Sequence, residues 1–234
     1  MELPTDRVRP GVQSFKGGTL HFEFGREITR ALKELVLETG TTLFMVLLSL
    51  YNILLSKISC QGDIVVGTPT AGRRHSDLAD LIGMFINTLA VRCQPEVNKT
   101  FTTFLAEVSQ RTLADFENQD YPFEDLVENV YVTRDTGRNP LFDTMFVLQN
   151  MNRSEIKIPG LKLMPYNYES RTSKFDLTLQ AVEEGNTLLF TFEYCTSLFR
   201  AETIKRFIDY FRKIVTSVLK NTGQKIWEIE IIPE

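Results

Sequence analysis

The side chains that could do chemistry gather in one stretch, "NQDYPFEDLVENVYVTRDTGRNPLFDTMF", residues 118–146. It combines acids, Arg, Asn and aromatic residues, but neither of the chain's two histidines lies in it. Asp120 and Glu124 are paired carboxylates that could serve acid–base catalysis. Because Pro122 breaks any helical face that they could share, we expect Asp120 or Asn118 to cap the following helix instead.

A second polar group, "RDTGRNPL" (134–141), precedes an apolar run that is typical of a strand. Asn139 stands before Pro140, which favours an extended backbone there. A charged group at the entrance of a buried strand is often a structural pin, in which an Arg such as Arg138 pairs with an Asp and with backbone carbonyls. Direct substrate contact by these side chains is the alternative, and the two interpretations are compatible.

The stretch "VVGTPTAGRR" places Gly67 and Gly72 after a predicted strand. A phosphate-binding loop of the G-x-x-x-x-G-K-[ST] type has similar glycines. Here Arg73 replaces the Lys and Arg74 replaces the Ser or Thr, and Pro69 removes a backbone N–H donor. The sequence therefore predicts a tight glycine loop that leaves a buried strand, and not a nucleotide site.

The two histidines are weak candidates for catalysis. His75 is followed by Asp77, but two residues apart on an irregular loop their side chains need not meet. His21 is expected on the polar face of a strand, beside Glu23, where a lone His is usually a surface residue. No HxxxD or GxSxG motif occurs. The residues alone therefore predict no convincing catalytic centre.

The composition is that of an ordinary globular chain, with 234 residues, 43% hydrophobic and 24% charged, and a net charge of -4. That charge recruits neither nucleic acid nor anionic lipid. The three cysteines form no CxxC pair, which argues against a metal site, and their odd number fits a reducing cytoplasm. Cys93 and Cys195 fall in apolar runs and are predicted to be buried. The longest apolar stretch, "LFMVLLSLYNILL", is shorter than the about 20 residues of a membrane span, so we expect a buried helix.

Strand and helix patterns alternate along the chain, which predicts an α/β fold, a two-layer sandwich of helices packed on a mixed β-sheet. Gly185-Asn186 is a hairpin signal between two strands. Gly40 should end the first helix, and Thr41 or Thr42 should cap the second. The strand at 84–93 is expected to be central, and the C-terminal "IWEIEIIPE" to be an exit strand or linker. The predicted strands cover 19–24, 63–67, 84–93, 141–150, 175–184 and 187–195, and the predicted helices 26–39, 43–58, 100–118, 123–130 and 204–219.

Three stretches, read in order, resemble the fifth, sixth and seventh core motifs of nonribosomal peptide synthetase condensation domains. They are "IGMFINTLAVR" (82–92), "NQDYPFE" (118–124) and "RDTGRNPL" (134–141). Further stretches, "LPTDRVRPGVQSF", "DIVVGTPTAGR" and "LFDTMFVLQN", resemble the sequence around these motifs in the same family. The likeness covers essentially the whole chain, and three ordered motifs make it highly specific.

The resemblance implies a chloramphenicol acetyltransferase-like lobe. Condensation domains have two such lobes, set in a V with a tunnel between them, and two carrier proteins deliver substrates on phosphopantetheine arms. The acceptor amine attacks the donor thioester, and an amide forms. The key histidine belongs to an HHxxxDG motif of the N-terminal lobe, which this sequence lacks. The chain therefore resembles the C-terminal lobe alone, inactive in isolation and with no directly bound cofactor.

The resemblance also assigns residues. Asn87 and Thr88 would line or support the tunnel, and Gly83 would let the backbone pass closely. A segment near 150–170 would form a latch that crosses to the other lobe. Gly137 stands where Ser is commoner in the family, which would add flexibility. The tunnel or supporting residues are Gly83, Asn87, Thr88, Asp135, Arg138 and Asn139, and the floor-loop candidates, in a loop that bridges toward the N-terminal lobe, are Thr68, Thr70 and Arg73.

The resemblance divides the chain into an inter-lobe linker (1–18), the C-terminal lobe (19–222) and an exit linker toward an adenylation domain (223–234). The expected partners are the N-terminal lobe, peptidyl and aminoacyl carrier proteins and the adjacent adenylation domain, with neither nucleic acid nor membrane. Two alternatives remain. The chain could be a non-catalytic docking module for carrier or adenylation domains, or a freestanding acyltransferase that uses His75 or His21.

Overall fold

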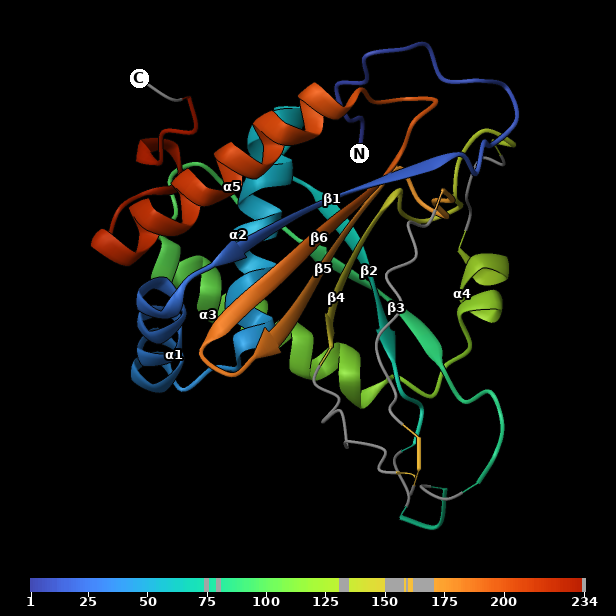
Figure 1. Cartoon of the computed structure of the whole chain (residues 1–234), viewed down its shortest axis with the longest axis horizontal. Coiled ribbons are helices and arrows are strands. Elements are labelled where there is room, and N and C mark those ends of the chain that lie inside the picture. The colour runs from blue at the N-terminus through green and yellow to red at the C-terminus, as the bar shows by residue number, and fades with distance from the viewer. Residues whose placement is uncertain are drawn as a thin grey trace.

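The computed structural model describes residues 1–73, 76–78, 81–130, 135–149, 158, 160–161 and 171–232. These residues form two layers, a six-stranded sheet and helices that cover one of its faces (Figure 1), which confirms the predicted α/β sandwich. The strands are β1 (Gly17–Phe24), β2 (Ile64–Thr70), β3 (Asn87–Cys93), β4 (Thr144–Gln149), β5 (Leu177–Glu184) and β6 (Thr187–Cys195). The helices are α1 (Arg26–Thr39), α2 (Leu43–Ser59), α3 (Phe101–Glu117), α4 (Phe123–Asn129) and α5 (Ala201–Lys220), with short 3-10 turns η1 (Ser76–Leu78) and η2 (Ile226–Glu228).

The sheet is mixed, in the strand order β1-β6-β5-β4-β2-β3. β4 lies parallel to both β5 and β2, and the other neighbouring strands are antiparallel. Gly185, with a φ of 59°, makes the tight turn between β5 and β6 that the Gly-Asn pair predicted. Because β4 and β5 are parallel neighbours, the two segments that lead into them lie side by side at the same end of the strands.

The prediction that 84–93 forms a central strand is wrong, because β3 is an edge strand that begins only at Asn87. Buried and exposed residues alternate along it, as Val91 and its exposed neighbour Arg92 illustrate. Such alternation is typical of a strand with only one covered face. Met84, whose apolar side chain lengthened the predicted strand, lies exposed in the connection before it.

The helical layer is centred on α2, which is buried along most of its length between the sheet, α3 and α5. Thr42 caps it as predicted, because its Oγ1 accepts the N–H of Met45 at 3.2 Å. Gly40, with a φ of 64°, ends α1. In the described parts of the chain no single helix is long and apolar enough to span a membrane, and α1 and α2 reach that length only together, across a bend of 107°.

The N-terminal segment, residues 1–16, passes one end of the strands and is bound to the rest of the lobe (Figure 1). The carboxylate of Asp6 accepts the N–H of Arg200 at 2.7 Å and the hydroxyl of Thr203 at 2.8 Å, at the start of α5. Arg7 donates to the carbonyl of Thr196 at 2.6 Å. The segment therefore packs against the sheet and α5, and its role as an inter-lobe linker stays a prediction.

The C-terminal residues pack against the start of α3. Phe101 donates its N–H to the carbonyl of Gln224 at 3.1 Å, and Ile226 donates to that of Lys99 at 2.9 Å. Ile226 and Ile229 are buried. The predicted exit strand is wrong, because these two side chains enter the core from the 3-10 turn η2 and the residue after it.

The cysteines lie where their surroundings predicted. Cys93 and Cys195 are buried and Cys60 is exposed. Burial raises the pKa of the Cys93 thiol to about 12, so this thiol stays protonated at neutral pH. Within the described ranges, no three side chains of the kinds that bind metal ions come together.

Candidate functional site

Asn87, the first residue of β3, binds the stretch 118–124 to the sheet. Its Nδ2 donates to the carbonyls of Gln119, at 2.8 Å, and Tyr121, at 2.7 Å. Its Oδ1 accepts the N–H of Thr88 at 2.8 Å and that of Phe123 at 3.2 Å. An amide side chain has two N–H donors and two acceptor lone pairs, so these four bonds use all of them. Asn87 therefore holds the backbone of residues 118–124 in place rather than offering a free polar group to a ligand.

The same contact corrects the predicted helix cap. Pro122 occupies the N-cap position of α4 and makes no side-chain cap, and Asn87 from a distant strand accepts the first helical N–H. Asn118 instead donates its side-chain N–H to the carbonyl of Ala114, at the end of α3. The prediction that Asn118 or Asp120 caps α4 is wrong, because a residue brought near by the fold satisfies the N–H.

The predicted glycine loop begins later than expected, because Gly67 to Thr70 belong to strand β2. The position in the remaining turn that needs a glycine is Gly72. Its φ is 63°, and a Cβ there would lie 1.8 Å from the carbonyl oxygen of Phe85. At Gly83 a Cβ would meet only the ring of Phe85, at 3.1 Å. The close backbone passage expected at Gly83 thus occurs at Gly72.

Arg73 joins the two legs of the β2–β3 connection, by which we mean residues 71–73 and 81–86. Its guanidinium carbon lies 4.3 Å from the centre of the Phe85 ring, and its Nη2 donates to the carbonyl of Gly83 at 3.4 Å. Thr68, another of the predicted floor-loop residues, is buried within β2. The second leg leaves four large apolar side chains exposed to solvent: Leu81, Ile82, Met84 and Ile86.

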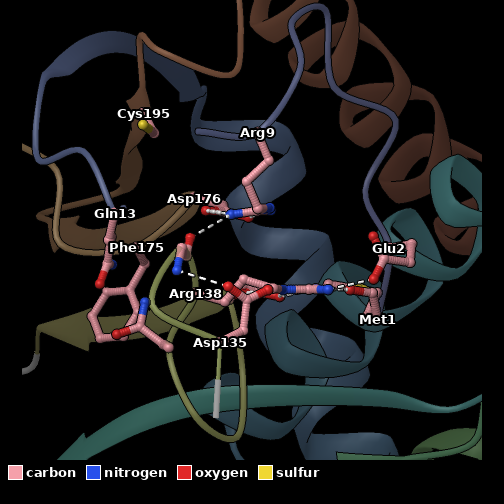
Figure 2. Close-up of polar contacts among 12 residues, drawn as sticks. Met1, Glu2, Arg9, Gln13, Asp135, Arg138, Phe175, Asp176 and Cys195 are labelled. Atoms are coloured by element: carbon pink, nitrogen blue, oxygen red, sulfur yellow. Dashed lines mark hydrogen bonds and ion pairs between the residues drawn. The ribbon is translucent and has the colours of Figure 1, made fainter. Parts of the chain in front are cut away.

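Arg138 makes the contacts that a structural pin requires, and Figure 2 shows its side chain directed toward the first two residues of the chain. Its Nε donates to Asp143 at 3.2 Å, and its Nη2 donates to the carbonyl of Met1 at 2.6 Å. It also forms ion pairs with Asp143 and Glu2. The hydrogen bond that Arg138 donates to the buried carboxylate of Asp143 raises the pKa of Arg138 above its ordinary value.

A second Arg–Asp pair lies beside the first. Arg9 forms an ion pair with Asp176, with a further contact of 3.0 Å between Nη1 and Oδ1 (Figure 2). The N–H of Asp176 donates to the carbonyl of Asp143 at 2.9 Å. Burial raises the pKa of Asp176, although the hydrogen bonds from Arg9 oppose that shift. Two buried carboxylates and two guanidinium groups thus neutralise each other, as buried charges must.

Sequence reasoning missed Arg9 and Asp176, but a signal for the second was present. The dipeptide Phe-Asp occurs directly before each of two strands, as Phe142-Asp143 before β4 and as Phe175-Asp176 before β5. The two strands are parallel neighbours, so the two dipeptides lie side by side. The rings of Phe142 and Phe175 stack with their centres 5.5 Å apart.

The remaining residues of "RDTGRNPL" hold the loop and the N-terminal segment together. Asp135 accepts the N–H of Gly137 at 2.8 Å, and Asn139 donates to the carbonyl of Lys174 at 3.3 Å. A Cβ on Gly137 would lie 2.7 Å from the carbonyl oxygen of Pro10. The missing side chain of Gly137 thus lets the N-terminal segment lie against the loop, and the flexibility expected at this residue stays a prediction.

An aromatic row connects these contacts with those of Asn87. The ring of Phe123, whose N–H binds Asn87, lies 5.6 Å from that of Phe142, which stacks on Phe175. Phe142 also covers Gly67 in β2, where a Cβ would lie 2.1 Å from the ring. The sixth and seventh motifs therefore form one packed wall, which includes the start of α4 and lies on the side of the sheet away from α2.

Some predicted residues lie elsewhere. His21 is exposed on β1, with its Nδ1 2.9 Å from Oγ1 of Thr191. His75 and most of the predicted latch at 150–170 fall outside the described residues. The wall is built from amide, hydroxyl, guanidinium and carboxylate groups that hold backbone in place.

Comparison with solved structures first defines the fold class. The chain superimposes on a four-domain nonribosomal peptide synthetase, holo-AB3403 bound to AMP and glycine, with a TM-score of 0.91, 26% identity and coverage of 99% of this chain and 19% of that one. It also matches the X-domain from teicoplanin biosynthesis, with a TM-score of 0.89, 22% identity and coverage of 99% and 53%. The fold is that of the condensation-domain class.

The sequence comparisons then place the chain more closely. The family model described as "Condensation domain" matches residues 1–234. The chain is 49% identical to gramicidin S synthase 2 of Brevibacillus brevis and 47% identical to tyrocidine synthase 3 of Brevibacillus parabrevis, over its whole length. It spans only 5% and 4% of those two proteins. The chain belongs to the condensation domain family of nonribosomal peptide synthetases.

Proposed function

We propose that the chain is the C-terminal lobe of a condensation domain, which forms peptide bonds between carrier-bound aminoacyl or peptidyl thioesters. One observation carries this proposal. Nearly all of this chain, 96% or more, superimposes on each of two solved condensation domains, but it matches only about half of each domain. The matched part is 52% of the condensation domain from the Monacolin K polyketide synthase MokA and 49% of the first condensation domain of the CDA synthetase. Both matches have a TM-score of 0.79.

The chemistry divides between two lobes in this proposal. The acceptor amine attacks the donor thioester carbonyl, so that a C–N bond forms, the C–S bond breaks and the amine loses a proton. Orientation of two tethered substrates can contribute roughly 7–11 kcal/mol, and a rigid wall can supply it. Proton transfer by a base, worth about 10²–10⁴-fold, would come from the histidine motif of the other lobe. The lobe alone is therefore inactive.

Each motif then has a task. The wall around Asn87 and Thr88 supports the tunnel. The loop of Asp135, Arg138 and Asn139 holds the side of the active region that the C-terminal lobe contributes. The legs of the β2–β3 connection, with Thr68, Thr70 and Arg73 at their base, reach the N-terminal lobe. Their exposed apolar side chains support this task, because such a surface marks a contact site.

The partners follow from the same assignment. Phosphopantetheine arms of carrier proteins enter as substrates, and residues 1–18 connect the two lobes. Residues 223–234 lead toward an adenylation domain. Support comes from the most similar structure described above, which is a four-domain synthetase bound to AMP and glycine.

The test compares this chain with a complete two-lobed domain made by joining it to the upstream lobe of its parent protein. Each is mixed with loaded donor and acceptor carrier proteins, and the peptidyl product is followed by mass spectrometry. We expect product only from the complete domain. Turnover by the chain alone would support the freestanding acyltransferase instead, and an inactive complete domain would support the docking module.

A further inference from the structure

We infer that Gln119 is a positioning residue for the acyl-transfer site, acting through Thr70 and Asn87 on the direction of the β2–β3 connection. The inference rests on the proposed function, because it gives that connection a task in the reaction. Gln119 contacts both Thr70 and Asn87, the residues at which the connection leaves β2 and enters β3.

Thr70 and Asn87 form the last rung of the β2–β3 ladder, where the two strands separate into the connection. Thr70 is buried, and its hydroxyl is fully engaged. It donates to Oε1 of Gln119 at 2.7 Å and accepts the N–H of Gly72 at 3.2 Å. The first leg is therefore bound at its base to Gln119.

Gln119 binds the second leg through its backbone. Its carbonyl oxygen accepts the Nδ2–H of Asn87 at 2.8 Å. Its side-chain Nε2 donates to the carbonyl of Phe116 at 2.8 Å, at the end of α3. One residue thus holds both partners of the last rung and ties them to a helix of the core, so it closes the ladder where the connection begins.

The legs beyond this rung have little freedom of their own. Gly72 lies so close to the Phe85 carbonyl that no side chain fits between them, and Arg73 covers the Phe85 ring. Legs that are joined in this way move together about their base. The exposed Ile82 and Met84 are carried on the second leg. Loss of the Gln119 contact should therefore turn the apolar side chains away from the surface that they meet, with little effect on the buried core.

The test uses the complete two-lobed domain and two variants that remove the Thr70–Gln119 hydrogen bond from opposite ends. Each also removes one further bond, that of Gln119 to Phe116 or that of Gly72 to Thr70. Gln119→Met keeps the length of the side chain, and Thr70→Val keeps its shape. We expect each to lower kcat for amide formation roughly tenfold, because small misplacements cost up to about 10²-fold, while KM for the carriers stays unchanged. The double variant should lose less than the two single losses added together, since both changes remove the Thr70–Gln119 hydrogen bond.

Two controls separate positioning from stability. Thr70→Ser restores the hydroxyl and should recover kcat, and Gln110→Met, at an exposed position of α3, should leave it unchanged. All rates are measured far below the Tm of each variant. Wild-type kcat in both single variants would overturn the inference, as would losses that add up and follow the fraction unfolded. An inactive wild-type domain would overturn the proposed function itself.

Discussion

Arg138 holds together three parts of the chain, its own loop, the start of β4 and the first residues of the N-terminal segment. Its partners Asp143 and Glu2 come from 5 and 136 residues away. Such a group works as a unit, because removal of one member leaves a buried charge without its partner. The polar residues of the seventh motif thus carry folding energy besides any contact with substrate.

Arg138→Ala should lower the free energy of unfolding by about 3 kcal/mol, since it strips the buried Asp143 of its counter-charge. The measurement is chemical denaturation of the two-lobed domain, with amide formation followed in parallel. Arg92→Ala is a matched control, because Arg92 and Asp63 are both largely exposed and such a pair contributes about 0–1 kcal/mol. A variant that keeps its stability but loses activity would contradict the pin interpretation and favour direct substrate contact.

The sequence predicted the kind of contact that Arg138 makes, because charge before a buried strand has few physical solutions. It could not identify the partners, since Glu2 and Arg9 reach the loop only in the folded chain. Asn87 shows the same limit. Its position in a motif was evident, but its four bonds depend on a segment more than 30 residues later that the fold brings beside it.

Among the elements, α5 depends on the N-terminal segment at its first turn. The described helix start has no side-chain cap of its own, and the carboxylate of Asp6 binds the N–H of Arg200 and the hydroxyl of Thr203 there. A negative charge at a helix N-terminus is also favoured by the helix dipole. The segment therefore stabilises the longest helix of the lobe.

Asp6→Ala should cost about 1 kcal/mol of unfolding free energy at pH 7, as for the loss of a helix cap. Burial raises the pKa of Asp6, but the bonds from Arg200 and Thr203 and the charges of Arg200 and Arg206 outweigh it and hold the pKa below 3.8. The stabilisation is therefore complete above pH 3.8 and is lost as the pH falls through the folded value.

Denaturation at a series of pH values checks this. The difference between wild type and Asp6→Ala should shrink below pH 3.8, whereas Asp6→Asn, which cannot titrate, should differ from the Ala variant by the same amount throughout. An unchanged difference between wild type and Asp6→Ala at low pH would show that Asp6 acts by packing and not by its charge.

Element types followed from periodicity, since α1 and α5 carry clear apolar stripes and α2 is one long apolar run. The errors fell where packing decides. The strand at 84–93 looked central because its apolar residues run together, but the first of them face solvent. Leu113 matched the apolar stripe of α3 and yet is 57% exposed. In each case the side chain is apolar but lies exposed to solvent.

On the scale of the whole molecule, the proposed function predicts that a partner lobe covers those exposed side chains. Ile82 is 105% exposed and Met84 93%, on a leg that projects from the sheet (Figure 1). The isolated chain should therefore self-associate at high concentration. Sedimentation should show less association after Ile82→Ser and Met84→Ser than after Leu37→Ser on α1, also exposed. A monomer at all concentrations would argue against a large uncovered face.

In the proposed function this chain is one wall of a cleft, and the second lobe meets the β2–β3 connection. Hydrogen exchange of the isolated chain and of the complete two-lobed domain measures that contact directly. We predict slower exchange of the amides at 81–86 in the complete domain, with those of the buried helix α2 unchanged. Equal exchange at 81–86 in both proteins would contradict the claim.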